Sequence, residues 1–322
     1  METRWLLQSS CFLLLGLVPT CSSAQNQLTA IQGETGYQFP TQGRMRWTSN
    51  LLAGCDYCEG SGPILWTTDR QGHRETIAFE IPGVERTSVR DVAAGPDGSL
   101  AAVGLAISGN SRMGTFIAWI SPDRSSQTIT RVWPFSPNVV VFAPDGTVWT
   151  VGSVGNDSYR RIYDNVLRHY TSSGQLLAST ILQGVRTQAN GFPEVSHASA
   201  LLASNDRIGW LTHSCQYIEF SLDGVELGRY SCPAGYAKEG DLAGVALSAS
   251  DDLLVGSQWL APLAPLQLNR AAGTWTSVPV TQDFGKTRSI LGFDGITLVT
   301  SSSTSSTMRR YSWSSQATTG GQ

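Results

Sequence analysis

Ionisable residues stand close to the start of several short apolar runs, where they could act together. Two converging carboxyl groups could supply the acid and the base that cleave a glycosidic bond, and an imidazole beside a carboxylate could serve a lactonase or a lyase. Carboxylate and carbonyl oxygens could also hold Ca²⁺. We favour the plainer interpretation that these groups pair with one another, because loop acids and arginines are mostly exposed. The residues are Arg90, Asp91, Glu194, His197, Glu239, Asp241, Asp283, Lys286 and Arg288.

Aromatic residues suggest one further place for a ligand. Trp259, Tyr159 and Arg160 lie in segments that lack a strand pattern, so a flat ligand could stack there. The sequence contains no histidine pair with zinc spacing, no Gly-x-Ser-x-Gly elbow and no phosphate-binding loop. We therefore predict no metal site and no cofactor, apart from the calcium alternative. Four other tryptophans sit within strand-like runs and are predicted to be core: Trp66, Trp119, Trp149 and Trp210.

The cysteines of the mature chain fall into two pairs. Cys55 and Cys58 have the spacing of a redox motif. The segment that follows, Glu59-Gly60-Ser61-Gly62-Pro63, is not a helix, whereas thioredoxin-like chemistry relies on a helix N-terminus to stabilise the thiolate. A small disulfide ring is therefore predicted between these two cysteines.

The second pair, Cys215 and Cys232, is predicted to bridge the two strands of one hairpin. Asp223-Gly224 is a preferred two-residue turn, and counting outward from it places the two cysteines directly opposite one another. The same count places them at a non-hydrogen-bonded pair, where the side chains of antiparallel strands come closest. An even number of cysteines in an exported chain also favours disulfides.

The first 24 residues have the layout of a secretory signal peptide. A weakly basic start is followed by the apolar run Cys11–Val18 and by small residues that end at Ala24, after which cleavage is expected. A retained anchor is the alternative, but the run is shorter than the roughly 20 residues that span a bilayer. No other segment could cross a membrane. We expect a secreted or periplasmic protein whose partner is an unidentified ligand or protein of that compartment.

The charge of the chain argues against nucleic acid as a partner. Charged residues make up 15% of the sequence and the formal net charge is −3. No basic stripe is present, and such a stripe is the usual electrostatic footprint of a nucleic-acid-binding surface.

The elements that must position these residues are strands that recur along the chain. Gly95-Pro96-Asp97-Gly98 and Ala143-Pro144-Asp145-Gly146 are near copies, and each lies between two runs of small, apolar or β-branched residues. Weaker versions occur near residues 204, 250 and 294. Each unit therefore begins with a strand, a tight turn and a second strand.

A second hairpin follows in each unit and carries an aromatic residue near one fixed place. Trp66, Trp119, Tyr170 and Phe220 are spaced by 53, 51 and 50 residues, and weaker copies lie near Leu266 and Tyr311. This spacing is close to the roughly 40–50 residues of a four-stranded propeller blade. We predict an all-β, six-bladed β-propeller of four-stranded antiparallel blades. Seven blades remain an alternative, because residues 41–62 are irregular.

The last unit lacks a fourth strand before the chain ends. The segment Gln27–Ile31 is the natural donor of that strand, and the ring would then have no open sheet edge. We predict one propeller domain over residues 25–314. A disordered tail of serine, threonine and glycine is expected over 315–322.

The central part of the chain resembles blades of NHL-type and TolB-like propellers. The resemblance rests on Pro144-Asp145-Gly146, on Val148–Gly152 and on the stretch Val166–Leu177, and it covers Arg90 to Leu182 best. The acidic residue and asparagine that follow the second strand in NHL blades are replaced here by Val151–Gly155. The resemblance therefore implies the fold and no family function, since propellers host hydrolases, lyases, lectins and scaffolds alike.

Loop lengths predict which face of the propeller is functional. The connections inside both hairpins are short, whereas the others are longer and variable, and binding residues usually sit on such loops. We predict a ligand- or protein-binding scaffold that uses the loop-rich rim. The alternative is a glycosidase- or lactonase-like hydrolase, or a lyase, acting at the mouth of the central channel. The longer connections are 108–114, 155–165, 188–196, 233–240 and 257–265.

Overall fold

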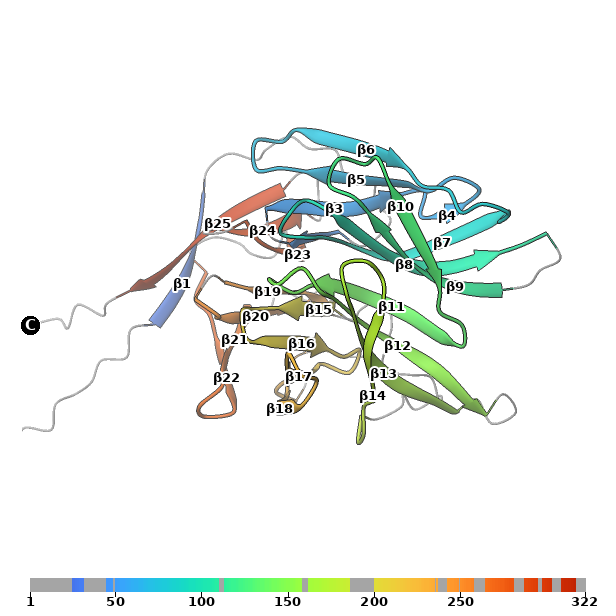
Figure 1. Cartoon of the computed structure of the whole chain (residues 1–322). Helices are drawn as coiled ribbons and strands as arrows, with labels where there is room; N and C mark the ends of the chain where they lie inside the picture. The colour runs from blue at the N-terminus through green and yellow to red at the C-terminus, as the bar shows by residue number, and fades with distance from the viewer. Residues whose placement is uncertain are drawn as a thin grey trace, which may run out of the picture.

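The structure is a computed structural model, and its strands form six antiparallel sheets arranged around a ring (Figure 1). This is the predicted six-bladed β-propeller, and the seven-bladed alternative is not observed. Residues 1–24, the expected signal peptide, lie outside the described part of the chain. The described residues are 25–31, 45–48, 50–109, 113–157, 162–185, 200–234, 236, 242–248, 250–257, 264–280, 287–294, 297–302 and 308–316.

Each blade runs from an innermost to an outermost strand. Blade 1 contains β2 (Arg46–Thr48), β3 (Leu51–Asp56), β5 (Ile64–Thr68) and β6 (Arg74–Ala78). Blade 2 contains β7 (Arg86–Ala94), β8 (Leu100–Ile107), β9 (Met113–Ile120) and β10 (Gln127–Arg131). Blade 3 contains β11 (Phe135–Phe142), β12 (Val148–Asp157), β13 (Ile162–Tyr170) and β14 (Leu176–Ile181).

The remaining blades follow the same plan. Blade 4 contains β15 (Ala200–Ala203), β16 (Arg207–Leu211), β17 (Gln216–Ser221) and β18 (Glu226–Ser231). Blade 5 contains β19 (Leu242–Leu247), β20 (Leu253–Ser257), β21 (Leu266–Asn269) and β22 (Thr274–Ser277). Blade 6 contains β23 (Thr287–Phe293), β24 (Thr297–Ser302), β25 (Met308–Gln316) and β1 (Gln25–Ala30).

The strand β1 closes the ring, as predicted. It pairs with β25 from Gln25 opposite Gln316 to Ala30 opposite Tyr311, and Figure 1 shows the two strands side by side. Leu28, at its centre, is fully buried. Because β25 reaches Gln316, Ser315 and Gln316 belong to a strand rather than to the expected tail, and residues 317–322 lie outside the described part.

The irregular segment of blade 1 crosses to the neighbouring blade. After β3 the chain forms β4 (Glu59–Gly60), which pairs with the first half of β7 and makes blade 2 five-stranded. The backbone amide of Val89 also donates to the carbonyl of Cys58 (2.8 Å). The irregularity therefore comes from a connection that joins blades 1 and 2.

The repeated Pro-Asp-Gly segments fold as matched turns. Asp97 accepts the backbone amide of Ser99, and Asp145 accepts that of Thr147, each at 2.9 Å. The glycines that follow these aspartates adopt positive φ angles of 87° and 80°, which favour glycine. The same turn chemistry thus ends the innermost strands of blades 2 and 3.

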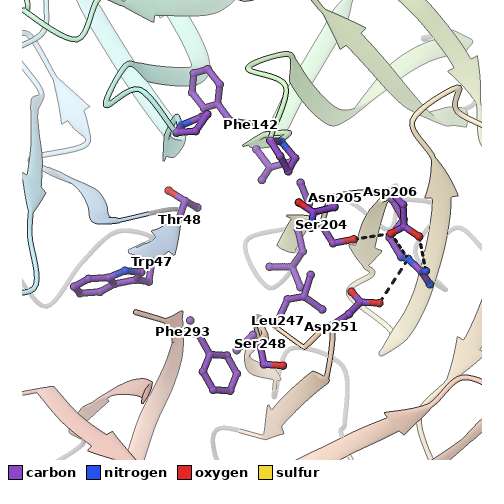
Figure 2. Close-up of a pocket in the computed structure, with 18 residues that line it drawn as sticks. Trp47, Thr48, Phe142, Ser204, Asn205, Asp206, Leu247, Ser248, Asp251 and Phe293 are labelled. Carbon is purple, nitrogen blue, oxygen red and sulfur yellow. Dashed lines mark hydrogen bonds and ion pairs between the residues drawn. The ribbon is translucent and has the colours of Figure 1, made fainter. Parts of the chain in front are cut away.

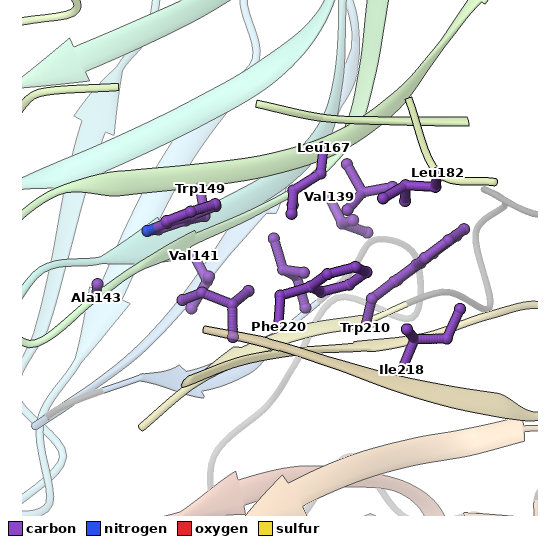
Figure 3. Close-up of a cluster of buried hydrophobic side chains, with 12 residues drawn as sticks. Val139, Val141, Ala143, Trp149, Leu167, Leu182, Trp210, Ile218 and Phe220 are labelled. Carbon is purple, nitrogen blue, oxygen red and sulfur yellow. The ribbon is translucent and has the colours of Figure 1, made fainter. Parts of the chain in front are cut away.

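The core is made between blades rather than within them. Figure 3 shows Trp149 of β12 with Trp210 and Phe220 of blade 4, all nearly free of solvent exposure. Trp66 and Trp119 are buried in neighbouring clusters. All four tryptophans predicted to be core are therefore core residues.

One arginine contact between blades occurs twice. Arg124, in the outer hairpin turn of blade 2, donates to Gly98 O of its own blade (2.8 Å) and pairs with Glu75 of blade 1 (2.8 Å). Arg270, in the outer hairpin turn of blade 5, donates to Asp251 O of its own blade (2.6 Å) and pairs with Glu219 of blade 4 (2.7 Å). In both cases the arginine joins a blade to the preceding one.

Candidate functional site

The central channel has two differently built mouths. In blades 1 to 5 both hairpin turns lie at one end, which we call the tight-turn mouth, and in blade 6 the connection from β23 to β24 lies there. The connections between the second and third strands, and between successive blades, lie at the other end, which we call the loop-rich mouth. Part of that mouth is more regular than expected, because the predicted loop 155–165 is largely hairpin, with Gly155 opposite Tyr163.

Most of the ligand-binding residues predicted from the sequence lie outside the described part of the chain. The described residues include Arg90 and Asp91 of β7 and the backbone of Arg288 in β23. Convergence of the others stays a prediction. Those outside the described part of the chain are Tyr159, Arg160, Glu194, His197, Glu239, Asp241, Trp259, Asp283 and Lys286.

Arg90 and Arg288 occupy equivalent bulges. The pairing of β7 with β8 skips Arg90, and that of β23 with β24 skips Arg288. The innermost strands β11 and β19 skip one residue in the same way. A bulge turns a side chain out of the regular alternation, so this repeated feature of the backbone sets the direction of the Arg90 side chain.

Glycines on the second strands make room for these bulges. A Cβ atom on Gly104 would collide with the carbonyl oxygen of Ser88, and one on Gly152 would collide with that of Ser136. The repeated Val-Gly pair in the sequence therefore has a steric cause.

Arg90 joins two blades. Its Nη1 donates to Ser136 Oγ (2.9 Å) and to the carbonyl of Pro137 (3.2 Å), both on β11 of blade 3. Burial lowers the pKa of the guanidinium from its ordinary high value. The contacts given for Arg90 are structural.

Asp91 lies in a buried ion pair within the ring. Its Oδ2 is 3.0 Å from Arg46 Nη2 and accepts the backbone amide of Val140 (2.9 Å). Arg46 Nη1 donates to the carbonyl of Leu201. These contacts join the innermost strands of blades 1, 2, 3 and 4. The sequence-based interpretation that ionisable groups pair inside the channel therefore holds for Asp91, and Arg46 already supplies a cation beside it.

A cavity of about 590 Å³ opens at the tight-turn mouth (Figure 2). Residues of all six blades line it. Arg46 and Leu201 directly precede the lining residues Trp47 and Leu202, so the buried pair lies one residue deeper in the channel than the cavity lining on these strands. The other lining residues are Thr48, Pro96, Val141, Phe142, Pro144, Ala203, Ser204, Asn205, Asp206, Arg207, Ala246, Leu247, Ser248, Asp251, Gly292 and Phe293.

One wall of the cavity is ionic. Arg207 binds Asp206 (2.8 Å) and also lies 3.7 Å from Asp251. Behind this wall, the buried carboxylate of Glu219 contacts Arg207 (3.4 Å) and Arg270 (2.7 Å). The hydrogen bond from Arg207 lowers the pKa of Asp206 to about 2. The Asp206 side chain remains 65% exposed.

The opposite wall is largely apolar. Figure 2 shows Trp47 across the open centre from Ser204 and Asp206, with Phe142 and Phe293 on the flanks. The cavity can therefore hold an apolar group against aromatic residues while a donor or a cation meets the carboxylates. Sequence reasoning missed it because it is built from short turns, whereas the prediction from loop lengths places the ligand at the loop-rich rim.

Cys215 and Cys232 form the predicted disulfide, with their Cα atoms 5.6 Å apart. The register reasoning behind that prediction was partly wrong. The turn is not two residues long, because the Ser221 amide donates to Val225 O (2.8 Å) and the Gly224 amide donates to Ser221 O (2.9 Å). A bulge in β18 then restores the predicted pairing of opposite residues, from Glu219 opposite Gly228 outward to the cysteines.

The turn and the bulge together exchange the hydrogen-bonded and non-hydrogen-bonded positions along this hairpin. The Cys232 amide donates to the Cys215 carbonyl at 2.9 Å, so the cysteines stand at a hydrogen-bonded position rather than at the predicted non-hydrogen-bonded one. Their Cα separation also matches the wider spacing of hydrogen-bonded pairs.

Cys55 and Cys58 differ from the expectation of a small disulfide ring. Both are free cysteines in the structure. The Cys58 thiol donates instead to the Cys55 carbonyl, with a sulfur–oxygen distance of 3.0 Å.

Among the described residues, no three histidine, cysteine or acidic side chains are grouped to hold a metal. The described part also contains no helix that is long and apolar enough to span a membrane.

The fold and the channel define a class: the chain is a six-bladed β-propeller. No protein-family model and no curated protein matches it. Among solved structures it is similar to the β-propeller domain of Cps50 (Swd1) from Myceliophteria thermophila, with a TM-score of 0.50 and 8% identity over 87% of this chain and 99% of that one. A likeness at this identity concerns the fold alone.

Proposed function

We propose that the chain is an exported binding protein that holds its ligand in the cavity at the tight-turn mouth. The observation that carries this proposal is the enclosure of the cavity by all six blades, with the Arg46–Asp91 pair deeper in the channel. A volume of about 590 Å³ falls within the range of small-molecule and side-chain pockets. Export is supported by the signal-like N-terminus and by the Cys215–Cys232 bridge.

The two walls suggest the chemistry of the ligand. Asp206 and Asp251 carry negative charge at one side, while Trp47, Phe142 and Phe293 present apolar surface at the other. An amphipathic ligand with an apolar body and a cationic or hydrogen-bond-donating head matches both walls. A peptide segment that contains an arginine beside apolar residues has these properties.

Binding suits this cavity better than acid catalysis. A glycosidase acid needs a carboxyl group whose pKa is raised, so that it is protonated near neutral pH. Arg207 instead lowers the pKa of Asp206 to about 2 and keeps it ionised. The hydrolase or lyase alternative would have to use other residues.

The test is calorimetry with matched synthetic peptides on the mature protein. One peptide carries a single arginine among leucine and phenylalanine, and its twin carries glutamate in place of the arginine. We expect binding of the first only. The Asp206→Asn variant should weaken this binding roughly two- to fivefold, as for a partly exposed ion pair.

Asp223→Asn is the matched control, because Asp223 is an exposed turn residue of the same blade that does not line the cavity. A double Tyr159→Ser/Arg160→Ser variant tests the loop-rich rim. If the rim variant alone abolished binding and the Asp206 variant were silent, the ligand site would lie at the loop-rich mouth instead.

A further inference from the structure

Cys55 and Cys58 are placed differently with respect to solvent. Cys55 lies near the end of β3, is 3% exposed and packs in the cluster between blades 1 and 2. Cys58 is partly exposed and follows Tyr57, whose side chain projects into solvent with 79% exposure. A reagent from solvent can therefore reach the second sulfur more easily than the first.

The backbone holds both ends of this four-residue turn. Cys55 is paired opposite Leu65 in the β3–β5 ladder, and the Cys58 carbonyl accepts the Val89 amide of blade 2 (2.8 Å). Tyr57 has a positive φ of 50°, which turns the chain back. The turn brings the Cys58 sulfur within 3.0 Å of the Cys55 carbonyl.

The two sulfurs also interact with each other. The nearby Cys55 side chain lowers the pKa of Cys58, whereas the Cys58 side chain together with burial raises the pKa of Cys55. The Cys55 thiol itself donates to the Asp56 carbonyl, with a sulfur–oxygen distance of 3.5 Å. Burial acts in the opposite direction on the pKa of Cys58, as do the neighbouring Asp56 and Glu59 carboxylates to a smaller extent. Cys58 thus has the solvent access of an attacking thiol, and its lowered pKa favours loss of the proton that the thiol otherwise donates to the Cys55 carbonyl.

We propose that Cys55 and Cys58 form an exchangeable dithiol that reduces low-molecular-weight disulfides, with Cys58 attacking and Cys55 resolving. The Cys58 thiolate attacks one sulfur of the small disulfide, forms a mixed disulfide and expels one thiolate. Cys55 then loses its proton and attacks Cys58 Sγ, which expels the second thiolate. The protons lost by Cys58 and by Cys55 pass through solvent to the two expelled thiolates, so the products are the Cys55–Cys58 disulfide and two reduced small thiols.

The second cysteine pair provides a control within the same chain. Cys215 and Cys232 are joined one residue beyond the last pair of the β17–β18 ladder, Gln216 opposite Ser231, and Cys215 is buried. We expect this bridge to stay oxidised under native conditions that interconvert the first pair. The proposal does not depend on the ligand proposed above.

The test uses the mature protein with reduced and oxidised glutathione in varied ratio, followed by alkylation and peptide mass mapping. We expect the Cys55–Cys58 bond to form and to break reversibly with the ratio, while Cys215–Cys232 stays joined. A Cys55–Cys58 bond that persists in excess reduced glutathione would show a fixed structural ring and overturn the proposal. Two thiols that never join would overturn it as well.

Single variants test the assigned roles. With oxidised glutathione, Cys55→Ser should accumulate a mixed disulfide on Cys58, because the resolving thiol is missing. Cys58→Ser should remain largely unmodified, because Cys55 is buried. Equal labelling of both variants, with unchanged far-ultraviolet circular dichroism, would contradict this division of roles. Should either variant fail to fold, the glutathione titration of the wild-type protein still decides the proposal.

Discussion

Arg46 of β2 and Asp91 of β7 meet inside the ring, with Arg46 Nη2 3.0 Å from Asp91 Oδ2 and both side chains less than a tenth exposed. Because this pair touches the backbone of two further blades, it couples four of the six innermost strands. Breaking a buried pair leaves an uncompensated charge, which costs about 3–5 kcal/mol.

The first prediction concerns this pair. Asp91→Ala should lower the free energy of unfolding by about 3–5 kcal/mol in a urea titration. The double variant Arg46→Met/Asp91→Leu should recover most of that loss, because it leaves no buried charge unpaired. A loss below about 1 kcal/mol for the single variant, typical of exposed pairs, would contradict a buried role.

The second prediction concerns ring closure. Leu28 is fully buried in the cluster between blades 5 and 6, whereas its neighbour Thr29 is exposed. Leu28→Ala should cost about 2–5 kcal/mol, and Thr29→Ala should cost little. Thermal melting of both variants checks this, and equal melting temperatures would mean that β1 contributes nothing to the ring.

The third prediction concerns the ionic wall of the cavity. The pKa of Asp206 is lowered to about 2, so its contribution to stability is present above its unfolded pKa of about 3.9 and is lost as the pH falls towards 2. Carbon NMR should give a midpoint near 2 for this carboxyl. Arg207→Gln should raise that midpoint towards the ordinary value for aspartate. An unchanged midpoint would show that Arg207 is not what lowers the pKa of Asp206.

The fourth prediction concerns the bulges. Gly104→Ala should destabilise the protein strongly, because the added methyl group meets the backbone oxygen of Ser88. Gly62→Ala is the control, since a Cβ there has open space and the backbone is not in the left-handed region. Similar unfolding free energies for the two variants would show that the bulge relaxes around the methyl group.

The repeat was predictable because its signals are local. The Pro-Asp-Gly turns and the aromatic series can each be recognised from a few neighbouring residues. The missing fourth strand after Tyr311 can also be recognised locally, because the chain ends shortly after that residue. The Cys215–Cys232 bridge was also found, although a longer turn and a bulge that offset one another were both missed.

What the sequence did not reveal depends on contacts between distant blades. Arg46 donates to the carbonyl of Leu201, which lies 155 residues away in the sequence. A pattern of neighbouring residues cannot predict a contact at that separation. The crossing of β4 to blade 2 was visible only as irregularity. The cavity was missed because it is formed by the arrangement of short turns around the ring, which the length of each turn does not indicate.

The pairing of β1 with β25 has a mechanical consequence. Gln25 and Gln316 stand directly opposite one another, at the same end of the two antiparallel strands. A force that pulls these two residues apart would load one rung of the ladder at a time and unzip it from Gln25 towards Ala30. The ring should therefore open at low tension when stretched by its two terminal strands.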